Sequence, residues 1–343
     1  DPNAIVSGLG REEWNELLRA PRHPLLNRSV QATYPPGSPF KLVTAGAGLE
    51  EGVIDHATTV VCKGAYKYGI RTFRCWKPEG HGLVDVLKGI VESCDVYMYQ
   101  VGAKLGVATL MDWTERCGFG ERTGIDIGGE VSGNVPTPDW YDRNYGRRRW
   151  SRGVVINLSI GQGELLVTPI QAAAFVAGIV NDGLVPQPHL LKRVETYSGR
   201  VIGTARTGAL HRLPFKESTL AFLRRSMVDV VEAPNGTGKQ SRLPGVEVGG
   251  KTGTAQNPHG EDHAWFVAYA PAENPRIVLA VIVENAGGGG AIAAPIAREV
   301  MRSYLRLPEP SPTPLQAPPP AEPDAAPSEG VVRPDADAGA PHG

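Results

Sequence analysis

The chain has 343 residues, 41% hydrophobic and 21% charged, an ordinary globular composition that excludes wholesale disorder, a collagen-like repeat and a disulfide-dense miniprotein. Its formal net charge of −1 gives no basic excess that would point to a nucleic-acid partner. No stretch reaches the roughly 18 consecutive apolar residues of a membrane-spanning helix, and the nearest candidate is 170–180.

The charge and the prolines divide the chain into two parts. Residues 307–343 hold 11 of the 30 prolines and carry a net charge of −5, whereas residues 1–306 carry +4. Proline lacks a backbone N–H, so a stretch this rich in it forms neither a helix nor a central strand. We therefore predict one domain over 1–306 and a disordered, acidic, Pro-rich tail over 307–343.

The first third of the chain contains a helix, a turn and a second helix. Apolar residues recur at helical spacing over 12–20, and a Pro-Pro-Gly turn signal follows at 34–37. Ser38 suits a helix N-cap and Pro39 suits the first helical position, so a helix is predicted to start at Ser38. Lys41 then lies one turn later on the same face.

The middle of the chain is less regular. Residues 52–82 are rich in glycine, aromatic and β-branched residues, which favours an irregular segment with strands over helices. Helical segments are predicted over 84–105, with a break around Ser93. Residues 125–152 are predicted to be rich in loops and end in the basic run Arg147-Arg148-Arg149-Trp150-Ser151-Arg152. This run fits a solvated loop or a contact with an anionic glycan or lipid surface, and the residues leave both open.

The last half of the chain predicts helices on either side of a group of strands. The predicted helices are 170–180, ended by Asn181-Asp182-Gly183, then 216–232 and 292–305. The predicted strands are 246–254, 264–270 and 276–283, the last two joined by a hairpin at 271–275. Strands between an early and a late helix, without βαβ alternation, indicate a mixed α/β sandwich and not a Rossmann fold.

Three short motifs carry the candidate chemistry. Ser38 and Lys41 have the spacing that lets an amine take a hydroxyl proton, although Ser-x-x-Lys alone also fits a helix cap followed by a surface lysine. Ser93-Cys94-Asp95 lies at a predicted helix break, and Lys251-Thr252-Gly253-Thr254 lies on a predicted strand. On that strand the missing side chain of Gly253 is expected to let a substrate backbone approach.

Together the motifs resemble the transpeptidase domain of class B penicillin-binding proteins, most closely the cell-elongation type called penicillin-binding protein 2. The resemblance covers about 1–306 and rests on Asn27-Arg28, the segment 34–41, Gly80-His81-Gly82, Ser93-Cys94-Asp95-Val96-Tyr97, the segment 159–163 and the segment 251–255. It implies the penicillin-binding, serine β-lactamase-like α/β (α+β) fold, with an antiparallel sheet flanked by helices and a mostly helical subdomain. The second motif ends in Asp95, whereas most of the superfamily has Asn at this position. An Asp here resembles the elongation branch.

The resemblance also implies roles for the first two motifs. Ser38 is expected to attack the D-Ala-D-Ala carbonyl of a peptidoglycan stem peptide, with Lys41 as its general base. Ser93 is expected to relay the proton to the leaving amine. Asp95 is expected to hold Lys41 or the substrate in place.

The third motif is expected to bind the substrate. Lys251 would supply positive charge to the relay and to the substrate carboxylate, which Thr252 and Thr254 would contact beside Gly253. The backbone N–H groups of Ser38 and Thr254 would form the oxyanion hole. The amine of a neighbouring stem peptide would then resolve the acyl-enzyme into a cross-link, and β-lactams would acylate Ser38 and stall.

The cysteines have three interpretations. Cys62, Cys75, His81 and Cys94 fall within one 33-residue stretch and form a Cys₃His set of the kind that closes a tetrahedral structural zinc site, while disulfides or free buried thiols fit the same spacing. The resemblance favours zinc, because some elongation-type members look to carry a metal here. No cofactor is expected in the catalysis itself.

Other functions and partners follow from the same resemblance. A D,D-carboxypeptidase would use the same residues but transfer the acyl group to water, and a β-lactam sensor or binding domain would keep the fold without the cross-linking. The expected partners are peptidoglycan stem peptides, β-lactams, a RodA-type membrane glycan polymerase and elongation-complex proteins. The catalytic domain is expected to face the periplasm from the inner membrane, with its anchor outside this sequence.

Overall fold

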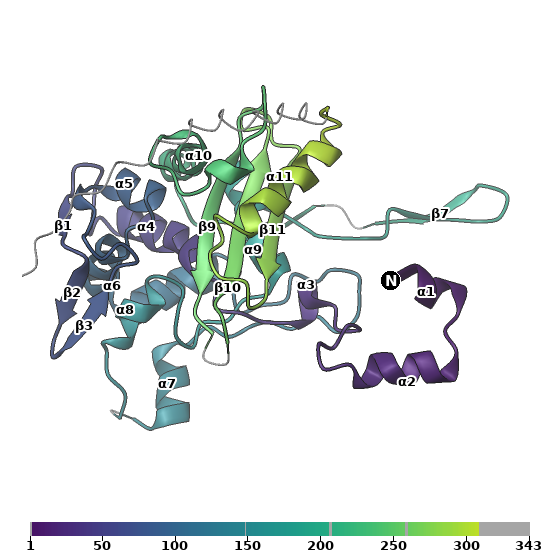
Figure 1. Ribbon diagram of the computed structural model, residues 1–343, viewed down its shortest axis with the longest axis horizontal. Coiled ribbons are helices and arrows are strands. Elements are labelled where there is room, and N and C mark those ends of the chain that lie inside the picture. The colour runs from purple at the N-terminus through teal and green to yellow at the C-terminus, as the bar shows by residue number, and fades with distance from the viewer. Residues whose placement is uncertain (1, 148, 206–207, 258–259, 309–343) are drawn as a thin grey trace, which may run out of the picture. The chain divides into compact units, whose positions relative to one another are not determined.

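The computed structural model describes residues 2–147, 149–205, 208–257 and 260–308 (Figure 1). Asp1–Leu307 forms one compact unit. The tail predicted over 307–343 lies outside the described residues from 309 onward. No helix in the described part of the chain is both long enough and apolar enough to cross a bilayer.

Helices make up most of the regular structure. They are α1 (Pro2–Ser7), α2 (Arg11–Arg19), α3 (Arg28–Gln31), the 3₁₀ helix η1 (Ser38–Phe40), α4 (Lys41–Glu50), α5 (Val86–Val91), α6 (Asp95–Arg116), α7 (Pro138–Tyr145), α8 (Val154–Leu158), α9 (Pro169–Val180), α10 (Glu217–Glu232), the 3₁₀ helix η2 (Lys239–Ser241) and α11 (Ala293–Tyr304). The helices predicted over 170–180, 216–232 and 292–305 are therefore confirmed as α9, α10 and α11.

The strands pair antiparallel throughout. They are β1 (Val60–Cys62), β2 (Ala65–Tyr68), β3 (Arg71–Arg74), β4 (Gly82–Val84), β5 (Leu184–Pro186), β6 (Arg193–Glu195), β7 (Val201–Thr204), β8 (Ala209–Arg212), β9 (Gly249–Ala255), β10 (His263–Ala270) and β11 (Ile277–Val283). The central sheet has the order β11-β10-β9, and the pairs β1-β4, β2-β3, β5-β8 and β6-β7 form two-stranded sheets. The irregular, strand-containing segment predicted over 52–82 is confirmed by β1–β3.

The central sheet is covered by helices on both faces, as predicted. Alternate residues of β10 belong to two different clusters of buried side chains. Trp265, Val267 and Tyr269 pack with α9, whereas Phe266 and Ala268 pack with the alanines and methionine of α11. Figure 1 shows α11 across the near face of the sheet and α9 behind it. Because successive side chains of a strand point to opposite faces, β10 is the centre of both layers.

A mostly helical region lies against one edge of the sheet. Eight of the ten residues of α4 are buried, and α4 packs against α6 and α10. The predicted break in the helical segments 84–105 is confirmed, because α5 ends at Val91 and α6 begins at Asp95. Ser93, in the break, has a positive φ of 57°.

The stretch predicted to be rich in loops, 125–152, contains one helix that the prediction missed. α7 starts at Pro138, and the side chain of Thr137 accepts a hydrogen bond from the Trp140 N–H at 3.2 Å. A capping Thr followed by Pro at the first position is a helix start signal. The signal was overlooked because the eight residues of α7 bury only Tyr141 and therefore show no long apolar period.

Candidate active site

The candidate nucleophile lies in a tight turn between three segments. Helical structure begins at Ser38, as predicted, but the N-cap of η1 is Gly37, which has a φ of 59°, so the prediction that Ser38 is the N-cap was wrong. A Cβ on Gly37 would lie 2.9 Å from the carbonyl oxygen of Thr254, and the Gly37 N–H donates to the Gly161 carbonyl at 2.9 Å. Only glycine allows this positive φ and this close approach.

Lys41 lies one turn after Ser38 and has no exposed surface. Its Nζ donates to Asp95 Oδ1 at 2.6 Å, to the carbonyl oxygen of Ser93 at 2.7 Å and to Ser93 Oγ at 3.1 Å. An ammonium group has three N–H donors, and these three acceptors match them. The predicted link between the first and second motifs is thus a buried ion pair with additional hydrogen bonds.

Lys251 approaches the same serine from β9. Its Nζ lies 2.9 Å from Ser93 Oγ and 3.1 Å from the carbonyl oxygen of Thr252. Complete burial, together with the positive charge of Lys41, holds the pKa of Lys251 well below its usual value of 10.5, while the carboxylate of Asp95 acts in the opposite direction. Ser93 Oγ therefore joins two amines, and a proton can pass between them.

Trp76 braces the second motif, and the sequence reasoning did not single it out. Its backbone N–H donates to Asp95 Oδ2 at 2.9 Å, and its indole Nε1 donates to the Ser93 carbonyl oxygen at 3.0 Å. Both oxygens of Asp95 are thus engaged, one by Lys41 and one by Trp76. No motif spacing signals this contact, because it depends on how the chain returns after β3.

The cleft has a volume of about 430 Å³ and is lined by residues of all three motifs. The predicted residues among its lining are Ser38, Ser93, Asp95, Thr252, Gly253 and Thr254. Lys41 and Lys251 lie beneath them, fully buried. The structure thus brings all eight predicted residues together around one cleft.

Two further residues support the strand that forms the third motif. Thr237 Oγ1 lies 2.8 Å from Thr252 Oγ1, and Gln162 Nε2 donates to the Thr254 carbonyl oxygen at 3.1 Å. Both Thr237 and Gln162 also line the cleft. Thr237 was not identified from the sequence, since a single threonine in a loop carries no recognisable pattern.

The role predicted for Gly253 differs from what the structure shows. A Cβ at Gly253 would lie 2.5 Å from Pro39 Cδ, so its missing side chain makes room for the proline of the nucleophile turn. A Cβ on Gly289 would lie 2.3 Å from the Gly253 carbonyl oxygen and 2.0 Å from that of Trp265. One wall of the cleft is therefore backbone packed on backbone.

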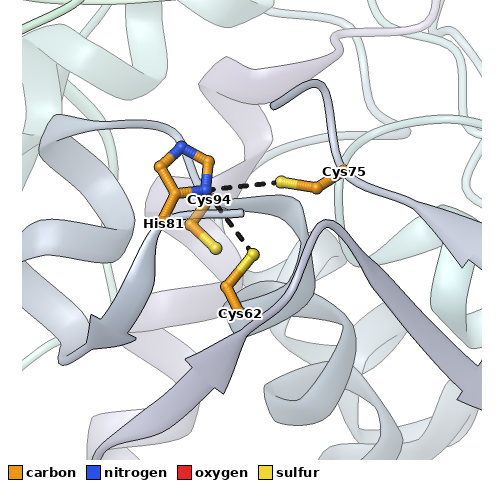
Figure 2. A group of neighbouring side chains, drawn as sticks. All are labelled: Cys62, Cys75, His81 and Cys94. Atoms are coloured by element: carbon orange, nitrogen blue, oxygen red, sulfur yellow. Dashed lines mark hydrogen bonds between the residues drawn. The ribbon is translucent and has the colours of Figure 1, made fainter. Parts of the chain in front are cut away.

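The four predicted metal ligands form a buried cluster next to the second motif. Cys62 comes from β1, Cys75 follows β3, His81 precedes β4, and Cys94 is the residue before α6. Figure 2 shows the side chains converging, with His81 Nδ1 at 3.6 Å from the sulfur of Cys62 and 3.5 Å from that of Cys75. All four candidate ligand atoms lie within 4.8 Å of one another.

The donor set fits a tetrahedral zinc ion. Bonds of about 2.3 Å to sulfur and 2.0–2.1 Å to nitrogen place neighbouring donors about 3.6–3.8 Å apart, which matches the nitrogen–sulfur distances here. All four cysteines, including the remote and buried Cys117, are free thiols. The pKa of Cys75 is lowered because the Cys94 thiol hydrogen-bonds to its sulfur, and a thiolate is the form that binds a metal.

A three-stranded sheet between helices, with a serine at a cleft over two buried lysines, is the arrangement of the penicillin-binding fold. The protein-family model described as the penicillin binding protein transpeptidase domain matches residues 1–302 of this chain. The chain therefore belongs to this family of transpeptidase domains, and it is of the penicillin-binding protein 2 (MrdA) type.

Curated relatives and solved structures carry the same assignment. The peptidoglycan D,D-transpeptidase MrdA of Haemophilus influenzae is 40% identical over 90% of this chain and 50% of its own length, and that of Escherichia coli K12 is 33% identical over 88% and 50%. PBP2 of Pseudomonas aeruginosa, solved in complex with WCK 5153, superposes with a TM-score of 0.80 at 34% identity over 90% of this chain and 67% of that chain. The chain spans about half the length of the curated relatives it matches.

Proposed function

We propose that the chain is the catalytic domain of a peptidoglycan D,D-transpeptidase that cross-links stem peptides through a Ser38 acyl-enzyme during cell elongation. The observation that carries the proposal is the hydrogen-bonded series from Lys41 through Ser93 Oγ to Lys251, directly beneath the cleft that Ser38 lines. Relatives named peptidoglycan D,D-transpeptidase support the reaction class.

Acylation begins with proton transfer away from Ser38. A neutral Lys251, favoured by its lowered pKa, accepts a proton from Lys41 through Ser93 Oγ, and Lys41 is then free to act as a base. Lys41 takes the Ser38 proton as Oγ forms its bond to the D-Ala-D-Ala carbonyl carbon. When the C–N bond to the terminal D-Ala breaks, Ser93 delivers its proton to the leaving amine and receives the proton that Lys41 took from Ser38.

The remaining residues stabilise charge. In this proposal the backbone N–H groups of Ser38 and Thr254 form the oxyanion hole, and the position of both residues in the lining of the cleft supports this role. The hydroxyl of Thr252 and the side chain of Thr254 bind the substrate carboxylate. Asp95 keeps Lys41 in position, so its contribution is to orientation. An amine from a second stem peptide completes the cross-link.

Labelling with a fluorescent penicillin tests this proposal. Stable labelling of the wild type that is lost in Ser38→Ala, but retained in Ser159→Ala, supports the acyl-enzyme; Ser159 is buried and donates to the Ile156 carbonyl oxygen at 2.7 Å. Rapid release of the label would indicate a β-lactamase. Transfer of the acyl group from a D-Ala-D-Ala peptide to water alone, with an amine acceptor present, would favour a D,D-carboxypeptidase. An unlabelled wild type would contradict the proposal.

We also propose that Cys62, Cys75, His81 and Cys94 hold a structural zinc ion. Such an ion closes the site with four protein ligands and supplies no catalytic chemistry. Cys94 lies between Ser93 and Asp95 in the chain, so fixing its sulfur fixes the backbone that presents both catalytic side chains. The donor geometry and the free thiols support this proposal.

Metal analysis of protein purified without chelator tests the zinc site. We expect about one zinc ion per chain in the wild type, its loss in Cys75→Ala and its retention in Cys117→Ala, which removes a buried thiol outside the cluster. Thermal unfolding should show a lower midpoint after metal removal, because a structural zinc contributes folding energy. A protein without zinc and with a Cys62–Cys75 bond in mass spectrometry would refute the proposal.

The cellular setting is part of the same proposal. We propose that the domain faces the periplasm and works beside a RodA-type glycan polymerase and other elongation-complex proteins. Support comes from neighbouring structures: PBP2 of Helicobacter pylori has been solved in complex with MreC, and a related chain in a peptidoglycan synthase complex. Co-purification of the full-length protein with such a polymerase from membranes tests the partnership.

A further inference from the structure

Two stretches of the chain carry basic side chains without any acid. Residues 56–78 contain five lysines and arginines and no Asp or Glu, and residues 143–152 contain five arginines and again no Asp or Glu. The whole chain has a net charge of −1, so these stretches stand out from its average. A balanced protein that concentrates one sign in two places creates a local positive potential there.

The arginines that the structure describes in these stretches are exposed, and none of them forms an ion pair. We define the arginine rim as Arg71, Arg74, Arg143, Arg147, Arg149 and Arg152, all of them exposed. Within the described part of the chain none of these six guanidinium groups forms an ion pair or donates a hydrogen bond. By contrast, arginines elsewhere pair with acids, as Arg224 does with Asp182 and Arg242 with Glu232. Among the described residues, no acidic side chain therefore pairs directly with a guanidinium group of the rim.

A cluster of packed aromatic side chains supports the rim. Tyr141 and Tyr145 of α7 donate their hydroxyls to the two carboxylate oxygens of Glu164, at 2.6 and 3.2 Å. The Trp150 ring stacks on Tyr141 with centroids 4.8 Å apart, and its Nε1 donates to Asp142 at 2.7 Å. These contacts fix both ends of the segment that bears the arginines. Specific contacts thus hold Tyr141 and Trp150, the residues on either side of most of the exposed arginines of this segment.

The aromatic cluster connects the rim to the cleft. Glu164 lies two residues after Gln162, which lines the cleft, and Arg74 lines the cleft itself at the end of β3. The two stretches also meet, because a Cβ on Gly153 would lie 3.7 Å from the ring of Tyr68. The rim is therefore continuous with the mouth of the proposed active site.

We propose that the arginine rim binds the carboxylates of the peptidoglycan strand whose stem peptide occupies the cleft. This inference rests on the proposed function and goes beyond it, because it assigns a docking surface for the polymer outside the reacting peptide. The guanidinium fork matches a carboxylate with two parallel hydrogen bonds. A strand with many peptides presents repeated carboxylates, so several weak contacts act together. A peptidoglycan strand whose peptide occupies the cleft must pass the edge of the cleft. This favours the peptidoglycan strand over a lipid surface as the occupant of the rim.

Co-sedimentation with purified bacterial sacculi tests the proposal. We expect the double variant Arg147→Glu/Arg149→Glu to bind sacculi at least tenfold more weakly than the wild type, and Arg147→Lys/Arg149→Lys to keep most of the binding. The matched control is Lys192→Glu/Arg200→Glu, which reverses two exposed charges on the β6–β7 hairpin on the other side of the sheet (Figure 1) and should bind as the wild type does. Thermal unfolding of each variant confirms that it is folded.

The outcomes separate this inference from the proposed function. Equal loss of binding in the control variant, or no loss in the rim variant, overturns the inference. Binding to vesicles of anionic phosphatidylglycerol but not to sacculi also overturns it and points to a lipid surface. Penicillin labelling of the wild type is scored separately: a labelled wild type that does not bind sacculi contradicts the rim alone, and an unlabelled one contradicts the catalytic proposal.

Discussion

Lys41 and Lys251 lie under the cleft without exposed surface, while the arginines of the rim stand in solvent at its edge. Both groups consist of basic residues, but their surroundings differ. Burial shifts a pKa and makes proton transfer possible, since a buried amine loses its hydration. Exposure keeps an arginine charged and leaves that charge free to attract a partner. The burial of a basic side chain, more than its charge, therefore distinguishes the lysines proposed to transfer protons from the arginines proposed to bind the substrate polymer.

The largest expected effect comes from removing the buried amine of Lys41, the proposed general base. Lys41→Ala should slow penicillin labelling of Ser38 by about 10³-fold or more, because a positioned general base contributes about 10²–10⁴-fold and an activated nucleophile is lost with it. Stopped-flow or gel-based labelling rates measure this effect. Lys104→Ala, an exposed lysine that donates to the Val53 carbonyl oxygen, is the control and should label normally. Near-normal labelling of Lys41→Ala would place the base elsewhere.

The second prediction concerns the pH dependence of stability at Lys251. Its pKa in the folded state lies well below the usual 10.5, so between these two values unfolding takes up a proton. The unfolding free energy of the wild type should therefore rise with pH relative to Lys251→Met, by at most about 1.4 kcal/mol per pH unit.

Urea unfolding at pH 7, 8 and 9 measures this difference between the two proteins. The Lys104→Met variant provides the reference for a surface lysine and should follow the wild type at each pH. If the wild type and Lys251→Met instead changed in parallel, Lys251 would not be a neutral amine in the folded protein.

The smallest expected effect sharpens the comparison directly. Raising the salt concentration from 0.05 to 0.3 M shortens the Debye length from about 14 to about 6 Å, so sacculus binding through the exposed rim should weaken several-fold. The rate of penicillin labelling should change less than about twofold, because buried charges are screened much less. Equal salt sensitivity of the two measurements would remove the distinction between the buried lysines and the exposed arginines.

The sequence predicted the regular elements better than their junctions. The period of apolar residues located α9, α10 and α11, and the motif order located the three segments that meet at the cleft. The contact from Trp76 to Asp95 was out of reach, because it depends on a chain reversal through the cysteine cluster. Thr237 was missed for the same reason, since a loop threonine becomes informative only beside Thr252.

Local rules also failed where tertiary contacts competed with them. Ser38 was expected to cap its own helix, but Gly37 takes that position because the turn must pass close to β9. Gly253 was expected to admit a substrate, yet the space at its Cα is filled by Pro39. In both cases the sequence showed that a small or turn-forming residue was needed. It did not show which neighbouring residue packs against it.

The wall formed by Gly253 and Gly289 limits how the site can change under selection. Proteins usually escape an inhibitor by exchanging a side chain that touches it. This wall has no side chain to exchange, and any residue other than glycine would place a Cβ 2.5 Å from Pro39 or 2.0 Å from the Trp265 carbonyl oxygen. Escape variants should therefore arise at residues that line the cleft with a side chain, such as Trp76 and Arg74.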